Sequence, residues 1–284
     1  MTSLDNSQID QLNNFKPALI FFDIDGTLLD TQGNYSSLLK QELERLSNKG
    51  VKLAIASGRP AIAAQFLFDD LPLTDAGLFC TGAELYNPKK RQHLQLHYLN
   101  LDDIKKINQR VEGLNIYCEY YASDFYTKGN DLDIASVHSE HLRVVPKCLM
   151  FTEICNKKIP ITKLLLGVNN KKNPGVLETL AIDFPQFEFA FAHFLARPDW
   201  LFASVVSQSA NKAMGFDHLL EFHGVASSEV MAFGDSHSDI LFLDKAGLGL
   251  AMGNANDNVK SAANMSTLSA DKDGVAQALR QILI

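Results

Sequence analysis

Two aspartates separated by a single residue stand at the end of an apolar run near the start of the chain. Residues 18–22 are all apolar and lead into the segment Asp23-Ile24-Asp25-Gly26-Thr27. A tight turn at a strand end accounts for Asp25 and Gly26, but it leaves Asp23 unexplained. At average residue usage, four fixed residue types in this order arise by chance on the order of 0.003 times in such a chain. Because the chain can turn past the strand end, we expect both carboxylates to converge on one point.

Other polar groups flank apolar runs in a way that predicts the same location. Ser57 follows the strand predicted at residues 52–56, Asp235 and Asp239 follow a later apolar run, and Lys212 stands ahead of a helical pattern. The carboxyl ends of parallel strands lie along one edge of a sheet, where α/β folds keep their sites. We therefore expect four carboxylates and one lysine at this edge.

This set of residue types indicates phosphate chemistry. Crowded carboxylates repel one another, and a divalent cation is the usual solution. Oxygen ligands alone favour Mg²⁺, which commonly binds one or two carboxylates together with a substrate phosphate. The backbone N–H groups of Gly58 and Arg59 precede Pro60, which suits the first position of a helix, so they can face the same anion. A lysine and a metal ion together suit a phosphoryl group.

The elements that must position these groups alternate between strands and helices. The first part of the chain predicts strands at residues 18–22, 52–56 and 78–81, with a helix at residues 35–50. The alternation returns near the C-terminus, with strands at residues 230–235 and 249–252 and helices at residues 240–245, 257–263 and 275–284. This order predicts an α/β fold with a Rossmann-like parallel sheet covered on both faces.

A region of different amino-acid composition and pattern separates the two alternating parts. It is richer in aromatic residues and polar alternation and has helical patterns at residues 101–111 and 174–182. We interpret it as an inserted α+β domain. The expected division is an N-terminal tail at residues 1–16, a core domain at residues 17–82 and 194–284, and the inserted domain at residues 83–193.

The composition limits the classes of partner. The 284 residues are 46% hydrophobic and 21% charged, as in ordinary globular proteins. The net charge of −7 comes without a basic patch, so we expect no nucleic-acid partner, and we interpret Lys89-Lys90-Arg91 as a solvated turn. We also expect no membrane partner and a cytoplasmic location, because residues 1–16 do not resemble a signal peptide and no long apolar stretch follows. The irregularly spaced Cys80, Cys118, Cys148 and Cys155 favour neither a zinc site nor a redox dithiol.

Together these segments resemble the four motifs of the haloacid dehalogenase (HAD) superfamily. The matching segments are Asp23-Ile24-Asp25-Gly26-Thr27, Ala56-Ser57-Gly58-Arg59, Lys212 and Gly234-Asp235-Ser236-His237-Ser238-Asp239. The later segments Ala251-Met252-Gly253-Asn254-Ala255 and Asp273-Gly274-Val275-Ala276 look like those of its Cof-type phosphatases. The resemblance covers about residues 17–282 and implies a Rossmann-like core with a mobile α+β cap.

The resemblance also implies catalytic roles. Asp23 would be the nucleophile that receives the phosphoryl group as an aspartyl phosphate. Asp25 would be the general acid for the leaving alcohol and then the base for water. Thr27, Ser57 and the backbone of Gly58 would bind the phosphoryl oxygens.

Charge compensation completes the implied site. Lys212 would offset the negative charge of the transition state. Mg²⁺ would be held by Asp23, Asp25, Asp235 and Asp239, with Asp239 acting directly or through a water molecule. Asn254 would orient this cluster.

The predicted function is a Mg²⁺-dependent phosphatase acting on small phosphomonoesters, such as sugar phosphates or phosphorylated cofactors. We expect a monomer or a homodimer. Two alternatives stay open at this point: a phosphoryl transferase or mutase, and a non-catalytic binding protein on the same fold.

Three positions depart from the usual Cof-type pattern. Ser236 replaces a glycine, Ser238 replaces an asparagine, and Thr81 stands where an asparagine commonly precedes Gly82. We expect these changes to affect specificity and rate before the class of reaction. We interpret His237 as a solvent-facing loop residue and Trp200 as a packing or hinge residue. The aromatic residues of the insertion are interpreted as sheet core rather than pocket lining: Tyr117, Tyr120, Tyr121, Phe125 and Tyr126.

Overall fold

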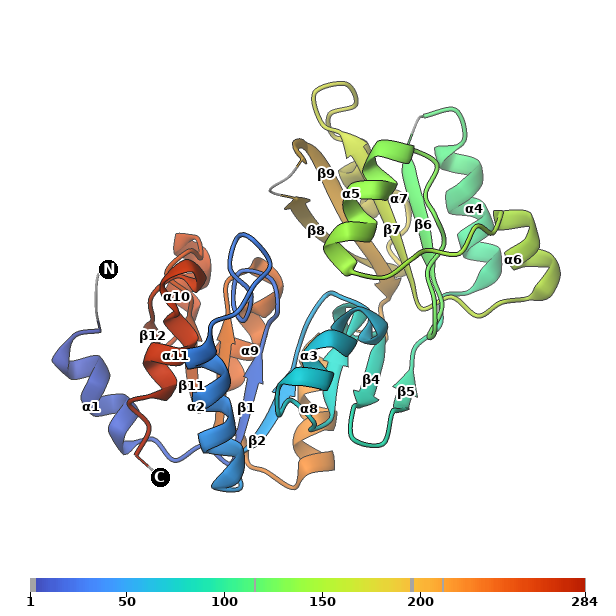
Figure 1. The fold of residues 1–284 in the computed structure, drawn as a ribbon. Helices are drawn as coiled ribbons and strands as arrows, with labels where there is room; N and C mark the ends of the chain where they lie inside the picture. The colour runs from blue at the N-terminus through green and yellow to red at the C-terminus, as the bar shows by residue number, and fades with distance from the viewer. Residues whose placement is uncertain (1–3, 115, 195–196, 211, 284) are drawn as a thin grey trace.

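A computed structural model describes residues 4–114, 116–194, 197–210 and 212–283 of the chain. Figure 1 shows two lobes, one built around a parallel sheet and the other around an antiparallel sheet. None of the helices in these described ranges combines the length and the apolar character that crossing a membrane requires.

The first lobe contains a five-stranded parallel sheet. In spatial order its strands are β12 (Met265–Ser266), β11 (Leu248–Ala251), β10 (Val230–Gly234), β1 (Leu19–Phe22) and β2 (Lys52–Ile55). All residues of β1 and β10 are buried, as expected for strands covered on both faces. The predicted α/β class with a parallel sheet is confirmed.

Alternate residues of each strand face two separate layers of helices. Ile20 and Phe22 of β1 belong to one apolar core, and Leu19 and Phe21 belong to the other. The first layer contains α1 (Asn6–Asn14), α2 (Ser37–Asn48), α3 (Gln65–Asp70) and α11 (Gly274–Leu279). The second contains α8 (Lys212–His223), α9 (Ile240–Lys245) and α10 (Asp257–Ala262). This two-sided packing holds the strand ends rigidly.

A three-stranded antiparallel sheet lies beside the end of β2. It consists of β3 (Gly77–Phe79), β4 (Glu84–Asn87) and β5 (Gln92–Leu96). The strand predicted at residues 78–81 ends at Phe79 because Cys80 and Thr81 adopt left-handed φ values of 48° and 58°. A parallel bridge between Ala56 and Leu78 links it to the parallel sheet, and Leu78 and Leu85 pack in the same apolar core as Ala56.

The second lobe contains a four-stranded antiparallel sheet. Its strands, in spatial order, are β6 (Tyr117–Tyr121), β7 (Lys163–Asn169), β9 (Arg197–Ser207) and β8 (Phe187–Phe194). One face packs against α4 (Leu101–Val111), α6 (Phe151–Lys157) and α7 (Val176–Asp183). The opposite face packs against α5 (Leu132–Leu142) and against Ala63 of the first lobe.

The residues at which the chain passes from one sheet to the next differ from the predicted domain limits of 83 and 194. Strands β4 and β5 continue the sheet that β3 begins, whereas β9 stays in the four-stranded sheet as far as Ser207. Hydrophobic alternation predicts that a strand exists, but it does not predict which sheet the strand joins. Short 3₁₀ segments complete the chain: Ala61–Ala64, Cys80–Gly82, Ser227–Glu229, His237–Asp239 and Ala270–Lys272.

Candidate active site

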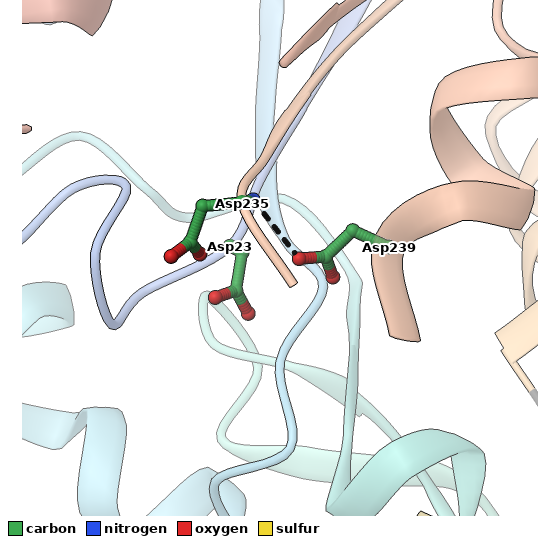
Figure 2. A group of neighbouring side chains, drawn as sticks. All are labelled: Asp23, Asp235 and Asp239. Atoms are coloured by element: carbon green, nitrogen blue, oxygen red, sulfur yellow. Dashed lines mark hydrogen bonds between the residues drawn. The ribbon is translucent and has the colours of Figure 1, made fainter. Parts of the chain in front are cut away.

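Three carboxylates converge at the ends of two neighbouring parallel strands. Asp23 follows β1, and Asp235 and Asp239 follow β10, whose Phe233 pairs with Phe22 of β1. One oxygen atom from each of the three carboxylates lies within 4.8 Å of the others. Figure 2 shows the three side chains and the hydrogen bond from the Asp235 N–H to Asp239 Oδ2, at 3.2 Å.

Two glycines permit this close approach. Gly26 has a φ of +74°, and a Cβ atom there would lie 2.4 Å from Asp235 Oδ2. A Cβ atom at Gly234 would lie 2.5 Å from the Cβ of Asp239. Any larger residue at either position would push the carboxylates apart.

Lys212 and Asp239 form a buried ion pair beside this cluster. Lys212 Nζ lies 2.5 Å from Asp239 Oδ1, and both side chains are almost fully buried. The other oxygen of Asp239 accepts hydrogen bonds from the N–H of Ser236 at 2.9 Å and from the N–H of Asp235. Both Asp239 oxygens are therefore engaged by protein donors, which fixes Lys212 and the loop after β10 in place.

The electrostatics of the cluster are those of crowded like charges. Burial raises the pKa of Asp23 well above its usual value, and the Asp239 charge adds to this effect. Burial also raises the pKa of Asp235 to about 7, again reinforced by Asp239. Burial opposes the ionisation of Lys212, but the neighbouring carboxylates of Asp239 and Asp23 raise its pKa overall. A bound cation would relieve this repulsion, and the donors are all oxygen atoms.

The Asp25 carboxylate is turned toward a different partner. Arg59 donates two hydrogen bonds to it, from Nε to Oδ2 at 2.7 Å and from Nη2 to Oδ1 at 2.6 Å. Asp25 does not belong to the group of three close carboxylates found among the described residues, although its charge still adds to the raised pKa of Asp23 and of Asp235. Burial opposes its ionisation, but the hydrogen bonds and charge of Arg59 lower the pKa of Asp25 overall.

Of the predicted phosphate-binding residues Thr27, Ser57 and Gly58, Thr27 contacts the carboxylate cluster, whereas Ser57 and Gly58 contact other partners. Thr27 Oγ1 donates to Asp235 Oδ1 at 3.4 Å, and the Ser57 hydroxyl accepts from the Arg59 N–H at 3.3 Å. The side chains of Thr27 and Ser57 are both buried. The carbonyl of Gly58 accepts a hydrogen bond from Lys163 of β7 at 3.1 Å, so the other lobe contacts this loop.

Asn254 lies where the resemblance implied. Its Nδ2 donates to Asp235 Oδ2 at 3.0 Å and to the carbonyl of Gly26 at 2.9 Å. It joins the segments after β1 and β10 and holds the Asp235 carboxylate in a defined orientation.

The two serines that depart from the family pattern belong to this network. Ser236 Oγ donates to Asp239 Oδ2 at 2.7 Å and lies 2.8 Å from Ser238 Oγ. Ser238 Oγ accepts from Lys212 Nζ at 3.2 Å. Both hydroxyl groups therefore support the ion pair of Lys212 with Asp239. The third departure, Thr81, places a β-branched residue in the left-handed region, where such residues are rare.

The sequence did not predict a role for the side chains of Arg59 and His141. For Arg59 it predicted only that the backbone N–H faces an anion, although the position of this residue in the second motif was a usable signal for its side chain. His141 of α5 lies 3.6 Å from Asp25 Oδ1 and has no motif around it. Burial lowers the pKa of His141 to about 4, against the opposing effect of Asp25.

Several aromatic residues of the second lobe lie in its apolar core, away from the carboxylates. Tyr117, Tyr121 and Tyr126 are fully buried in the core between α5 and the sheet, as expected for sheet core. Trp200 packs in the same core, and His237 is exposed.

Comparison with known proteins agrees with this fold and site. The haloacid dehalogenase-like hydrolase family matches residues 20–279, so the chain belongs to this family. The 5-amino-6-(5-phospho-D-ribitylamino)uracil phosphatase YitU of Bacillus subtilis is 26% identical over 272 residues, covering 94% of this chain and 97% of that protein.

Solved structures give the same result. A haloacid dehalogenase-like hydrolase from Bacteroides thetaiotaomicron has a TM-score of 0.83 at 27% identity, covering 95% of this chain and all of the other. The sugar phosphatase BT4131, of HAD subclass IIB, has a TM-score of 0.78 at 25% identity, covering 92% of this chain and 97% of the other. The prediction of a Cof-type HAD enzyme, a phosphoric monoester hydrolase acting on small phosphate compounds, is confirmed at the level of class.

Proposed function

We propose that this enzyme is a Mg²⁺-dependent phosphatase that hydrolyses small phosphomonoesters through an aspartyl-phosphate intermediate. The observation that carries the proposal is the convergence of Asp23, Asp235 and Asp239 beside Lys212. A binding module needs no nucleophile, and this arrangement surrounds one carboxylate with the charges that phosphoryl transfer requires.

The reaction divides between the first two aspartates. The Asp23 carboxylate attacks phosphorus, and the alcohol leaves with a proton from Asp25. Water then attacks the aspartyl phosphate and loses a proton to Asp25, which regenerates Asp23 and releases phosphate. Thr27, Ser57 and the backbone of Gly58 bind the phosphoryl oxygens in both steps.

Arg59 sets the starting state of Asp25. Its two hydrogen bonds favour the ionised carboxylate, which is the form that accepts a proton from water. To act as the acid, Asp25 takes up a proton from solvent, which requires its bonds with Arg59 to loosen as the substrate binds. This coupling would keep Asp25 from carrying a proton until an ester is bound. The proton that Asp25 accepts from water in the second step returns to solvent when phosphate leaves.

The donor set fits Mg²⁺. Asp23 and Asp235 would hold the ion, because both Asp239 oxygens already accept bonds from protein donors. When bound, the ion neutralises carboxylate charge and polarises the phosphoryl group. Asp239 would act by orienting Lys212 and the loop at residues 235–236.

The substrate would be a soluble phosphorylated metabolite. One relative is named for a ribitylamino-uracil phosphate and one structural neighbour is named a sugar phosphatase, which supports a hydroxylated small molecule. The second lobe would act as the cap that excludes water and selects the ester. A cytoplasmic location and a monomeric or homodimeric state stay predictions.

Phosphate release tests this proposal. The assay uses a panel of phosphomonoesters, with Mg²⁺ and with EDTA, on the wild-type enzyme and on Asp23→Asn. We expect metal-dependent release that the variant lacks. Transfer that requires a second sugar as acceptor would indicate a mutase instead, and binding of esters without turnover would indicate a non-catalytic protein.

A further inference from the structure

The last turn of α5 brings a histidine from the second lobe to the reacting edge of the parallel sheet. His141 Nε2 lies 3.6 Å from Asp25 Oδ1 and 3.4 Å from Arg59 Nη2. The reaction described above gives this imidazole no role. Its side chain is 32% exposed, so a bound molecule can reach it.

On the side toward the interior of the second lobe, His141 packs against a buried polar network. Its ring lies nearly parallel to that of His138, with the ring centroids 6.2 Å apart. His138 Nδ1 lies 2.8 Å from Glu119 Oε2, and Glu119 also accepts hydrogen bonds from the hydroxyl groups of Tyr117 and Tyr121. Glu119 is fully buried. Such a network specifies one arrangement, because each buried polar group needs its partner.

Arg143, which follows the last turn of α5, contacts the first lobe and so helps to fix the position of this helix end. Arg143 Nη2 donates to the carbonyl of Gly33 at 2.6 Å, and its guanidinium lies 4.3 Å from the centroid of the Phe66 ring. Gly33 belongs to the short segment between Asp25 and α2. His141 is therefore held between two anchors, one in each lobe.

Arg59 retains a hydrogen-bond donor at this place. Its side chain is 5% exposed, and Asp25 uses its Nε and Nη2. Its Nη1 is buried and has no hydrogen-bond partner in the part of the chain that the structure describes. A buried guanidinium donor of this kind calls for an acceptor, which an oxygen atom of a bound molecule would supply.

We propose that His141 and Arg59 form the subsite for the alcohol part of the ester, with His141 contacting a hydroxyl group beside the ester oxygen. The inference rests on the proposed function, because Asp25 marks the ester oxygen if it is the general acid. An imidazole offers a donor and an acceptor nitrogen, which matches a hydroxyl group. Glu119 and His138 are positioning residues in this arrangement.

Kinetics with two kinds of leaving group test the subsite. We compare His141→Ala with wild type on glucose 1-phosphate and glycerol 3-phosphate, which carry a hydroxyl group on the carbon next to the ester carbon, and on p-nitrophenyl phosphate, whose leaving group carries none. We expect kcat/KM to fall about tenfold on the hydroxylated esters, mainly through KM, and to change less than about twofold on p-nitrophenyl phosphate. His141→Gln, which keeps hydrogen-bonding capacity, is expected to recover part of the loss.

The matched control is Glu140→Gln, an exposed neighbour on the same helix, which is expected to behave as wild type on all three esters. An equal loss on all three esters for His141→Ala, or no loss on any, would overturn the subsite. Thermal unfolding of each variant separates these results from a folding defect.

A binding measurement keeps this test separate from the test of turnover. In the Asp23→Asn background, calorimetry with glucose 1-phosphate and with inorganic phosphate reports the alcohol and phosphate contacts separately. The subsite predicts that adding His141→Ala weakens binding of the ester and leaves inorganic phosphate unchanged. Unchanged ester binding would overturn it. If the wild-type enzyme releases no phosphate from any ester, the proposed function fails, and this binding comparison still decides the subsite.

Discussion

In the core lobe the side chains of the candidate site follow the ends of parallel strands, whereas His141 of the second lobe, which lies close to Asp25, comes from a helix that covers the face of a sheet. Asp23 and Asp235 are placed by the backbone register of β1 and β10, and glycines let them approach. His141 is placed by side-chain contacts with His138 and, through it, Glu119. The two lobes thus position functional groups by different means.

This difference indicates which positions should tolerate substitution without loss of stability. A carboxylate held by strand register can be replaced by an amide without moving its neighbours. A histidine held by a buried polar network depends on every member of that network. We therefore expect substitutions in the core site to affect chemistry, and substitutions behind His141 to affect stability and substrate choice.

The largest expected effect is the loss of turnover in Asp23→Asn. The amide is a poor nucleophile, so phosphate release becomes undetectable while the fold is kept, as checked by circular dichroism and thermal unfolding. Without Mg²⁺ we also expect the unfolding midpoint to be no lower than in wild type, because one of the repelling charges is gone. Asp244→Asn, an exposed aspartate of the same lobe, is the control. Near-normal activity in Asp23→Asn would contradict the mechanism.

Asp25→Asn is expected to lower kcat by about 10²-fold or more, the lower range for lost acid–base catalysis. The loss should be smaller with p-nitrophenyl phosphate, whose leaving group needs little help from an acid. Steady-state kinetics on both ester types checks this. Equal losses on both would assign the acid role to another residue.

The pH dependence of unfolding gives a second test of Asp25, because a pKa that differs between the folded and unfolded states makes stability depend on pH. The pKa of Asp25 is lowered in the folded state, because the hydrogen bonds and charge of Arg59 outweigh the opposing effect of burial. Its contribution to stability is therefore present above the unfolded pKa and is lost as the pH falls through the folded value. Asp25→Asn should lack this part of the pH dependence, and an unchanged pH profile would contradict the pairing.

Glu119→Ala is expected to lower the free energy of unfolding by about 3 kcal/mol, because it leaves two tyrosine hydroxyls without their acceptor and removes the carboxylate that lies 2.8 Å from His138 Nδ1. Chemical denaturation measures this value. Glu188→Ala, an exposed carboxylate of the same sheet, is expected to change it by less than about 0.5 kcal/mol. If Glu119→Ala changes activity but leaves the free energy of unfolding unchanged, the expected difference between the two lobes is contradicted.

The smallest effect is expected for Ser236→Gly, which restores the residue usual in the family. It removes the hydrogen bond from Ser236 Oγ to Asp239 and is expected to lower kcat about three- to tenfold. An increase in kcat would mean that the serine restrains the loop rather than supporting Lys212.

Much of the core site could be predicted from the sequence. The order of apolar runs and polar ends identified β1, β2, β10 and β11, and the motif residues Asp23, Asp235, Asp239 and Lys212 lie together as expected. The sequence did not predict the partner of Asp25, whose carboxylate accepts two hydrogen bonds from Arg59. Both are polar residues of the same sheet edge, and spacing alone cannot say which partner a side chain turns to.

The sequence by itself determined the class of fold, the family and the aspartates proposed to react, because strand periodicity and short motifs are local signals that can be read without coordinates. Only the tertiary structure decided which sheet β4, β5 and β9 join and which residue of the second lobe meets Asp25. His141 lies far from Asp25 along the chain, and the helix that carries it has the pattern of an ordinary packing helix. Its role depends on how two lobes dock, and docking is set by the sum of many side-chain contacts rather than by any one segment.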